Sequence, residues 1–231
     1  MKTKHANAGL VNILFMPGAG GTFLANMLSR AITDPWWNDY VPESPNELFK
    51  ATNEFINQYN HIVMTWHPWD LKDTSLFKDT CWVNLTQTPA ELKFTEIMSA
   101  IKRQDYNGVT KKDILDRMYA TTHPFYDKML IQQGTGVAEL VKENTVINVK
   151  YSDIFINGNH NVILSIINHV FNGQYVAEGI VANIAACCIA KHESDKHLWN
   201  ELYYNTDVTL DNILEIAVPS TEVSGEHSTL S

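Results

Sequence analysis

Short apolar segments alternate along the chain with longer segments in which apolar residues recur every three or four positions. Four of the short segments are apolar and partly β-branched, and they are predicted to be strands: residues 11–16, 61–66, 81–86 and 145–150. Helical spacing extends over residues 22–31, 160–171 and 175–192. Alternation of this kind predicts an α/β fold with three layers, in which helices flank a central, mostly parallel β-sheet.

Three residues mark the start of one helix. Thr88 is a favourable N-cap, Pro89 suits the first helical position, and Glu91 completes a capping box at the third. This helix is expected to run through Ile101. A further helical pattern extends from residue 110 to about residue 133.

The composition indicates one globular domain. Of the 231 residues, 45% are hydrophobic and 19% are charged, and no repeat or linker divides the chain, so residues 1–218 are predicted to form a single α/β domain. Residues 219–231 are small and polar, and they are predicted to be a disordered tail. The net charge of −9 disfavours nucleic acid as a partner. No apolar run approaches the roughly 18 residues of a membrane span, so no membrane partner is expected.

The three cysteines do not form a disulfide framework of the kind found in secreted domains. Their number is odd, and Cys187 and Cys188 are adjacent. A reducing cytoplasm is therefore the predicted location. Both residues fall in an apolar helical segment, and they are expected to be small core residues and not nucleophiles.

A glycine-rich segment joins the first predicted strand to the first predicted helix. Residues 15–24 read FMPGAGGTFL. Backbone N–H groups at such a strand-to-helix turn, together with the helix dipole, favour an anion. The segment lacks the lysine of the Walker A pattern and the last glycine of G-x-G-x-x-G. A tight turn that binds no ligand remains the alternative.

Four segments, in the same order along the chain, resemble the motifs of the sulfotransferase family. The resemblance lies in the phosphosulfate loop (Pro17, Gly20, Thr22, Phe23, Leu24), the strand end with the catalytic histidine (His67, Pro68), the 3′-phosphate motif (Pro89, Thr95) and the strand end with tyrosine (146–155). It spans residues 10 to about 173. The chain would be a divergent member of this family, and the resemblance implies the P-loop NTPase-like, sulfotransferase-type fold.

The resemblance also implies an activity and a site. The donor would be 3′-phosphoadenylyl sulfate, with adenosine 3′,5′-bisphosphate as the product and no metal. The donor-binding residues would be Pro17, Gly18, Ala19, Gly20, Gly21, Thr22, Phe23, Gln87 and Thr95. His67 would be the general base, with Thr22 as a second catalytic residue that stabilises the leaving phosphate. The acceptor would be a hydroxyl or amine of a small molecule or carbohydrate; the sequence indicates neither its identity nor the oligomeric state.

The chain departs from the family at two cationic positions. Gly18 stands where the family has lysine or arginine, and Gln87 stands where it has the arginine that binds the 3′-phosphate. Lys93 and Lys150 are the candidate replacements. Two alternatives to the transferase stay open: a small-molecule kinase that lacks the Walker A lysine, and a non-catalytic nucleotide-binding P-loop protein.

Several of these residues also have an ordinary structural interpretation. His67 can cap its strand, and Thr95 can be a solvent-facing helical threonine. The four tryptophans Trp36, Trp37, Trp66 and Trp69 can form a wall for an acceptor such as a sugar ring, although packing in the core or at its rim is favoured. His192 and His197 lie in a charged helical stretch and are expected to face solvent.

Overall fold

The computed structural model describes residues 10–30, 62–71, 80–102, 110, 121, 123–171, 178–202, 210 and 213–214. The predicted tail 219–231, Trp36, Trp37 and most of the helical pattern that begins at residue 110 lie outside these residues. The strands are β1 (Leu10–Leu14), β2 (Ile62–Trp66), β3 (Cys81–Thr86) and β4 (Thr145–Lys150). The α-helices are α1 (Gly21–Arg30), α4 (Pro89–Lys102), α6 (His123–Leu140), α7 (His160–Phe171) and α8 (Glu178–Leu202), joined by the short turns η1 (Pro68–Asp70) and η3 (Ser152–Ile156).

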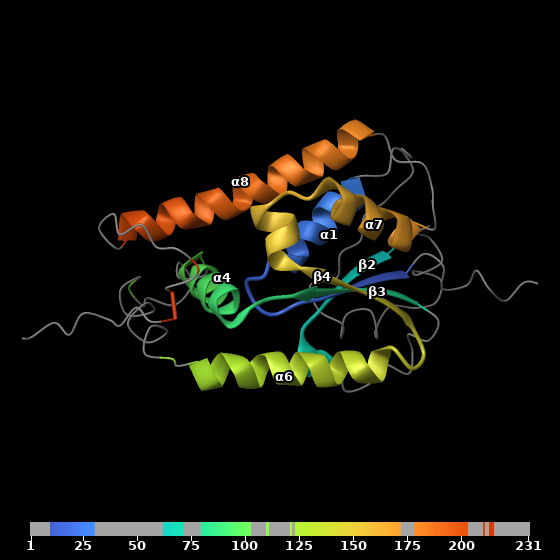
Figure 1. The fold of residues 1–231 in the computed structure, drawn as a ribbon, viewed down its shortest axis with the longest axis horizontal. Helices are drawn as coiled ribbons and strands as arrows, with labels where there is room; N and C mark the ends of the chain where they lie inside the picture. Colours follow the sequence, from blue (N-terminus) through green and yellow to red (C-terminus); the bar gives the residue numbers. More distant parts are fainter. Residues whose placement is uncertain are drawn as a thin grey trace, which may run out of the picture.

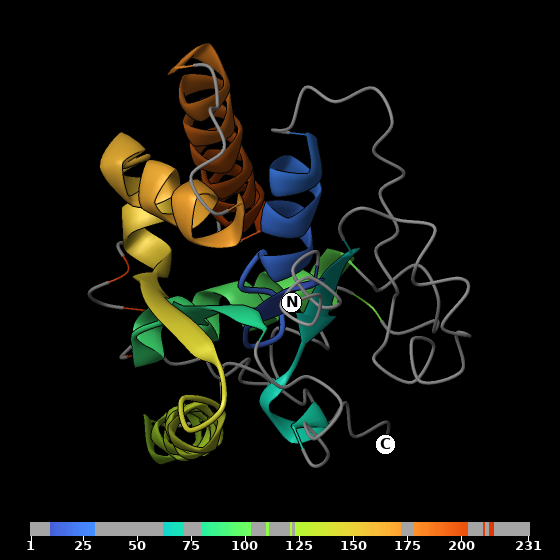
Figure 2. The ribbon, with the colours of Figure 1, turned by 90° about the vertical axis from the view of Figure 1, so that its right-hand side faces the viewer.

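The four strands form one parallel sheet in the order β2-β1-β3-β4. Leu14 pairs with Trp66 on one side and with Asn84 on the other. The described part of the chain is therefore an α/β fold with a parallel sheet, as the alternating pattern predicts. Helices cover both faces: α1, α7 and α8 lie on one side of the sheet, and α6 lies on the other (Figures 1 and 2).

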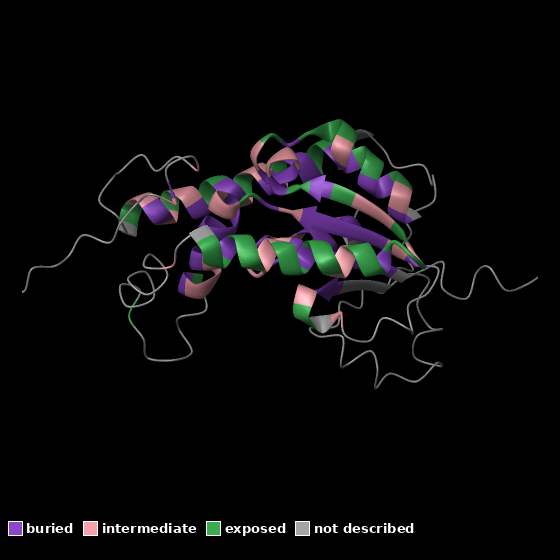
Figure 3. Ribbon diagram, turned by 60° about the horizontal axis from the view of Figure 1, so that its bottom comes forward, coloured by how far each residue is buried: buried purple, intermediate pink, exposed green. Residues whose placement is uncertain are grey.

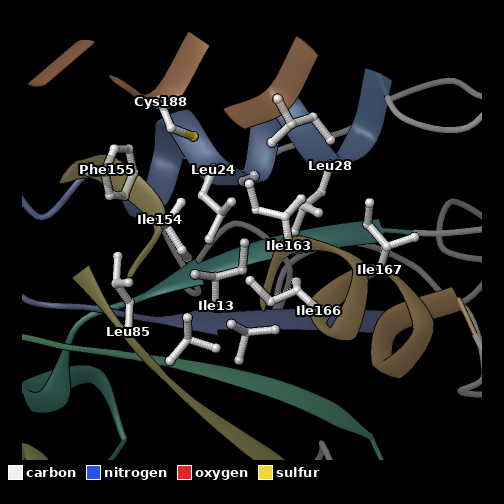
Figure 4. Close-up of a cluster of buried hydrophobic side chains, with 14 of the residues drawn as sticks. Ile13, Leu24, Leu28, Leu85, Ile154, Phe155, Ile163, Ile166, Ile167 and Cys188 are labelled. Carbon is white, nitrogen blue, oxygen red and sulfur yellow. The ribbon is translucent and has the colours of Figure 1, made fainter. Parts of the chain in front are cut away.

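The main hydrophobic core lies between the sheet and the helices α1, α7 and α8 (Figure 4). Strand side chains alternate between faces, so Val11 and Ile13 point into this core together with Val83 and Leu85 of β3. The helices complete it with apolar residues at helical spacing: Leu24, Leu28, Ile163, Ile166, Ile167, Ile184 and Cys188. Cys188 is fully buried, as the sequence predicts.

The face of the sheet toward α6 carries buried polar side chains. Gln133 of α6 donates from Nε2 to Asn84 Oδ1 over 2.8 Å, and Asn84 donates to Asn148 Oδ1 over 2.8 Å. Trp66 is also buried there and donates from Nε1 to Asn12 Oδ1 over 2.9 Å. These bonds satisfy groups that would be costly to bury alone, and they tie the strands to α6. Figure 3 shows the outer face of α6 exposed and the inner strands β1 and β3 mostly buried, whereas β4 is mostly exposed or half-buried.

The direction of the chain reverses between β1 and β3. From β1 the chain passes through α1 to β2 on one side, whereas from β3 it passes through α4 and α6 to β4 on the other. The carboxyl ends of the parallel neighbours β1 and β3 thus lie at the same edge of the sheet, but the connections that follow them lead in opposite directions. In open α/β sheets this switch point is where ligands bind. It is formed here by residues 15–20 after β1 and by Gln87 and Thr88 after β3.

Candidate functional site

The glycine-rich loop holds two glycines in left-handed backbone conformations. Gly18 and Gly20 have φ angles of 79° and 80°. Within the loop, the Ala19 N–H donates to the Met16 carbonyl over 3.0 Å. The first helical bond of α1 runs from the Leu24 N–H to the Gly20 carbonyl, over 2.8 Å. The amides of the three preceding residues, 21–23, therefore have no acceptor within the helix.

These amides make the start of α1 the predicted anion-binding element. The helix dipole adds partial positive charge there, and the Thr22 side chain beside it is exposed. Pro17 is half-buried and Ala19 is fully buried, so the loop offers an anion backbone amides and the Thr22 hydroxyl in place of cationic side chains. Phe23 is half-buried, and its ring centroid lies 6.3 Å from that of Phe155 in η3.

Three glycines of the loop are each in close contact with another part of the chain. A Cβ atom on Gly18 would lie 2.0 Å from the Thr95 carbonyl oxygen of α4. One on Gly20 would lie 2.7 Å from the Phe155 ring, and one on Gly21 would lie 2.0 Å from the Phe15 ring. Packing alone thus requires glycine at these positions. The case for a ligand must therefore come from the groups around the loop and not from its glycine content.

His67 lies beside the first residue of this loop. Since Leu14 pairs with Trp66, the residues that follow them, Phe15 and His67, are neighbours past the ends of β1 and β2. His67 Nδ1 lies 3.0 Å from the Phe15 carbonyl oxygen, and the half-buried imidazole packs against the Phe15 ring at a centroid distance of 4.7 Å. A carbonyl oxygen only accepts hydrogen bonds, so Nδ1 carries the proton. In the neutral ring Nε2 is then the basic nitrogen.

Trp69 flanks the other side of His67. The two ring centroids are 4.8 Å apart with an interplanar angle of 32°, and 49% of Trp69 is exposed. The turn that carries it, η1, is anchored because Leu71 packs where a Cβ on Gly136 of α6 would lie. Of the two described tryptophans in the predicted acceptor wall, Trp66 is buried in the sheet and Trp69 alone reaches the surface.

Gln87 and Thr95 lie together beneath the loop. Gln87 Nε2 donates to Thr95 Oγ1 over 2.8 Å, and the same hydroxyl donates to the Leu92 carbonyl over 3.3 Å. Thr95 is 1% exposed, so its interpretation as a solvent-facing threonine is wrong: α4 turns this residue toward the Gly18 loop. Gln87 is 8% exposed, and its buried Oε1 has no hydrogen-bond partner in the described part of the chain.

The start of α4 is fixed by the predicted capping box. The Glu91 N–H donates to Thr88 Oγ1 over 3.2 Å, and the Thr88 N–H donates to Glu91 Oε2 over 2.7 Å. These reciprocal bonds set the direction in which α4 leaves β3. They thereby hold Thr95, one turn further on, against the loop.

A second polar cluster lies behind Phe155. Tyr151 is fully buried, its hydroxyl lies 2.9 Å from His192 Nδ1, and its ring stacks on Phe155 at 4.9 Å. Burial raises the pKa of Tyr151, and the charge of Asp195 adds to this effect. Burial also lowers the pKa of His192. Asp195 is 2% exposed and forms ion pairs with Lys191, at 3.0 Å, and with Lys102.

This cluster corrects one prediction and includes residues that the sequence did not indicate. His192 is 2% exposed and faces the core, so the expectation that it faces solvent is wrong; His197 is exposed as expected. Of the two lysines predicted to replace the missing cations, Lys93 is 1% exposed and its pKa is lowered by burial, whereas Lys150 is exposed. The available signal for the cluster was the spacing of His192, Asp195 and Trp199, which lie on one face of a helix.

Comparison with known protein families and with curated proteins finds no match to this chain. Its class therefore rests on its own fold, an α/β protein with a four-stranded parallel sheet. Among the described residues, no three histidine, cysteine, aspartate or glutamate side chains gather closely enough to hold a metal ion. None of the described helices is both long enough and apolar enough to cross a membrane.

Proposed function

We propose that the chain is a sulfotransferase-like enzyme of the P-loop type. It transfers a sulfuryl group from 3′-phosphoadenylyl sulfate to a hydroxyl or amine of a small molecule or carbohydrate, in the cytoplasm. The donor supplies the electrophilic sulfur and leaves as adenosine 3′,5′-bisphosphate. The support is a juxtaposition at the switch point of the sheet: a glycine loop followed by amides that have no acceptor within α1, an imidazole base, and a buried Gln–Thr pair.

The hydrogen bond between His67 and the Phe15 carbonyl is the observation that carries the proposal. It fixes the tautomer in which Nε2 takes a proton, which is what a general base for an acceptor hydroxyl or amine must do. It also holds the ring at the first residue of the loop. The same bond also caps the end of β1, so the rate of transfer by His67→Ala is the measurement that separates a base from a structural histidine.

The groups around the loop supply the contacts that the proposal assigns to the donor. Amides 21–23 and the Thr22 hydroxyl would hold the oxygens of the 5′-phosphosulfate and stabilise charge on the leaving phosphate. The amide of Gln87 and the hydroxyl of Thr95 would hold the 3′-phosphate. A 180° rotation of the Gln87 amide lets its Oε1 accept from Thr95 and turns its NH₂ group toward a ligand. The neutral Gln87 and Thr95 side chains are expected to bind 3′-phosphoadenylyl sulfate more weakly than the family's arginine does.

The second candidate is a non-catalytic nucleotide-binding protein of the same fold. The observation that favours it is the close packing of Gly18, Gly20 and Gly21, which explains these residues without a reactive ligand. His67 argues against it. A kinase without the Walker A lysine would use the same loop for a nucleoside triphosphate and Mg²⁺.

Thermal unfolding with added ligands separates these functions. Adenosine 3′,5′-bisphosphate is expected to raise the Tm of the native protein, because a ligand that binds only the folded state stabilises it. ATP with Mg²⁺ at the same concentration is expected to leave the Tm unchanged. Stabilisation by ATP alone would favour the kinase, and stabilisation by neither would contradict the proposed function. Transfer of labelled sulfate from the donor to a panel of acceptors then distinguishes the enzyme from the non-catalytic protein.

A further inference from the structure

The proposed anion site contains no cation of its own in the loop. Residues 15–24 carry no charged side chain, and Gly18 stands at the position where the family has lysine or arginine. The sulfuryl and phosphate oxygens are strongly anionic, so amides alone leave part of their charge without a counter-charge. A cation from another element would complete the site.

Lys191 of α8 lies against Phe155, a residue of η3 whose ring packs on the loop. Its Nζ lies 5.4 Å from the centroid of the Phe155 ring, in a cation–π contact. The Cζ atom at the tip of the same ring lies 2.7 Å from the position that a Cβ on Gly20 would take. One aromatic ring thus touches the lysine and the loop together. The side chain of Lys191 is 17% exposed, so its charge is only weakly screened by water.

The pairing of Asp195 leaves Lys191 able to change partners. Asp195 binds both Lys191 and Lys102, so it keeps one ion pair when Lys191 moves away. The three charges sum to one positive charge. The nearby charged groups of α8, Glu193 and Lys196, pair with each other at 3.3 Å, whereas the buried carboxylate of Glu91 in α4 also acts on this cluster.

A second observation concerns a buried amide on the side of the loop where Gly18 meets Thr95. Gln87 is more than nine-tenths buried, and its Oε1 has no hydrogen-bond partner among the residues that the structure describes. Its other terminal atom binds Thr95, whose carbonyl lies against Gly18. A buried polar atom without a partner is costly. Rotated by 180°, the amide would let Oε1 accept from the Thr95 hydroxyl and would turn its NH₂ group toward a bound anion, which removes that cost.

We propose that Lys191 is the cationic residue of this anion site and replaces the lysine or arginine that is absent at position 18. When an anion binds at the start of α1, Lys191 leaves Asp195 and pairs with the phosphosulfate oxygens past the edge of Phe155, while Lys102 stays on Asp195. The proposal rests on the proposed function for the nature of the nucleotide, but it concerns a residue that the sulfotransferase motifs do not contain.

The test compares two lysine variants that share one partner. Lys191→Met and Lys102→Met each remove one ion pair of Asp195, but only Lys191 contacts Phe155. Binding of adenosine 3′,5′-bisphosphate to the full chain is measured by titration calorimetry, and folding is checked by circular dichroism and Tm. Lys191→Met is expected to weaken binding about 10- to 100-fold, the loss of one charge-assisted bond. Lys102→Met is expected to bind within about 2-fold of the unmodified protein, and Lys191→Arg to retain most of the affinity.

Each other outcome has a distinct meaning. Equal affinity of Lys191→Met and the unmodified protein would overturn the role of Lys191 and leave the proposed function standing. Equal losses in the two methionine variants would also overturn it, because the effect would then come from Asp195. Absence of binding by the unmodified protein would overturn both proposals. If Lys191→Met does not fold, Lys191→Gln, which keeps a hydrogen-bond donor for Asp195, serves in its place with the same expected loss.

Discussion

The imidazole of His67 donates its Nδ1 proton to the main-chain carbonyl oxygen of Phe15 over 3.0 Å. This bond joins the ends of β2 and β1 and sets the ring beside the glycine loop. His67→Ala is expected to reduce the rate of sulfuryl transfer about 10²- to 10⁴-fold, because it removes the base at Nε2. Binding of adenosine 3′,5′-bisphosphate is expected to change little. Initial rates and the ligand-induced Tm shift measure the two effects.

The control for this variant is His160→Ala. His160 is an exposed histidine at the start of α7. It is expected to leave the transfer rate unchanged. If His67→Ala transferred the sulfuryl group as fast as the unmodified protein, another group would have to be the base.

Substitution by alanine is predicted to change the free energy of unfolding in opposite directions at Gly20 of the loop and at Gly134 of α6. At Gly20 the new Cβ would meet the Phe155 ring at 2.7 Å, and the φ angle of 80° disfavours any side chain, so Gly20→Ala is expected to lower the free energy of unfolding by about 2 kcal/mol or more. At Gly134, within α6, nothing lies within 4 Å of the new Cβ. Gly134→Ala is expected to raise the free energy of unfolding by about 0.5–1 kcal/mol. Urea titrations measure both, and a neutral Gly20→Ala would contradict the packing described here.

The buried His192 is predicted to make stability depend on pH. Burial lowers its pKa in the folded protein below the value of about 6.5 that it has when unfolded. The unfolded chain therefore binds a proton that the native protein excludes, and the free energy of unfolding falls as the pH decreases through about 6.5. Above that pH the His192 side chain is neutral in both the folded and the unfolded state, so it no longer lowers the free energy of unfolding.

Two variants isolate this effect. Urea titrations at several pH values between about 5 and 8 are expected to give a shallower dependence of stability on pH for His192→Gln than for the unmodified protein. His197→Gln, on the exposed face of the same helix, is expected to keep the original dependence. An unchanged slope in His192→Gln would show that other groups cause it.

The thiol of Cys188 is predicted to be unreactive in the native protein. It is fully buried, and burial raises its pKa to about 12. The reactive thiolate is therefore scarce near neutral pH. Iodoacetamide is expected to modify Cys188 only after unfolding in guanidinium chloride, and fragment-ion mass spectrometry separates it from the adjacent Cys187. Rapid modification under native conditions would show that α8 opens.

The sheet was predictable because its signals are local. The strands 81–86 and 145–150 were predicted with the bounds that the structure has, since apolar β-branched residues and flanking turn residues define them. The capping box of α4 was predicted for the same reason. The first strand ends at Leu14, two residues before the predicted end, because the chain turns there into the loop. α8 runs to Leu202 and not to residue 192, because its charged part also has a buried face.

The site was predictable only in part because its contacts join distant segments. Gln87 and Thr95 were placed by a motif, and they meet across the start of one helix. The contact between Tyr151 and His192 joins the end of β4 to α8, and the spacing of His192, Asp195 and Trp199 indicates a buried helix face without identifying its partner. The close contacts of the glycines are likewise set by tertiary packing. The sequence therefore indicates where the loop lies but not what surrounds it.

The exclusively parallel pairing of the described strands has a consequence for synthesis. Leu10 pairs with Ile62 and Val11 with Cys81, so β1 leaves the ribosome before both of its neighbours and finds neither until much more of the nascent chain has emerged. During that interval its apolar side chains and its unpaired backbone N–H and C=O groups are open to aggregation. Such long-range closure also slows folding. Overproduction is therefore expected to benefit from slower translation or from chaperones that shield β1.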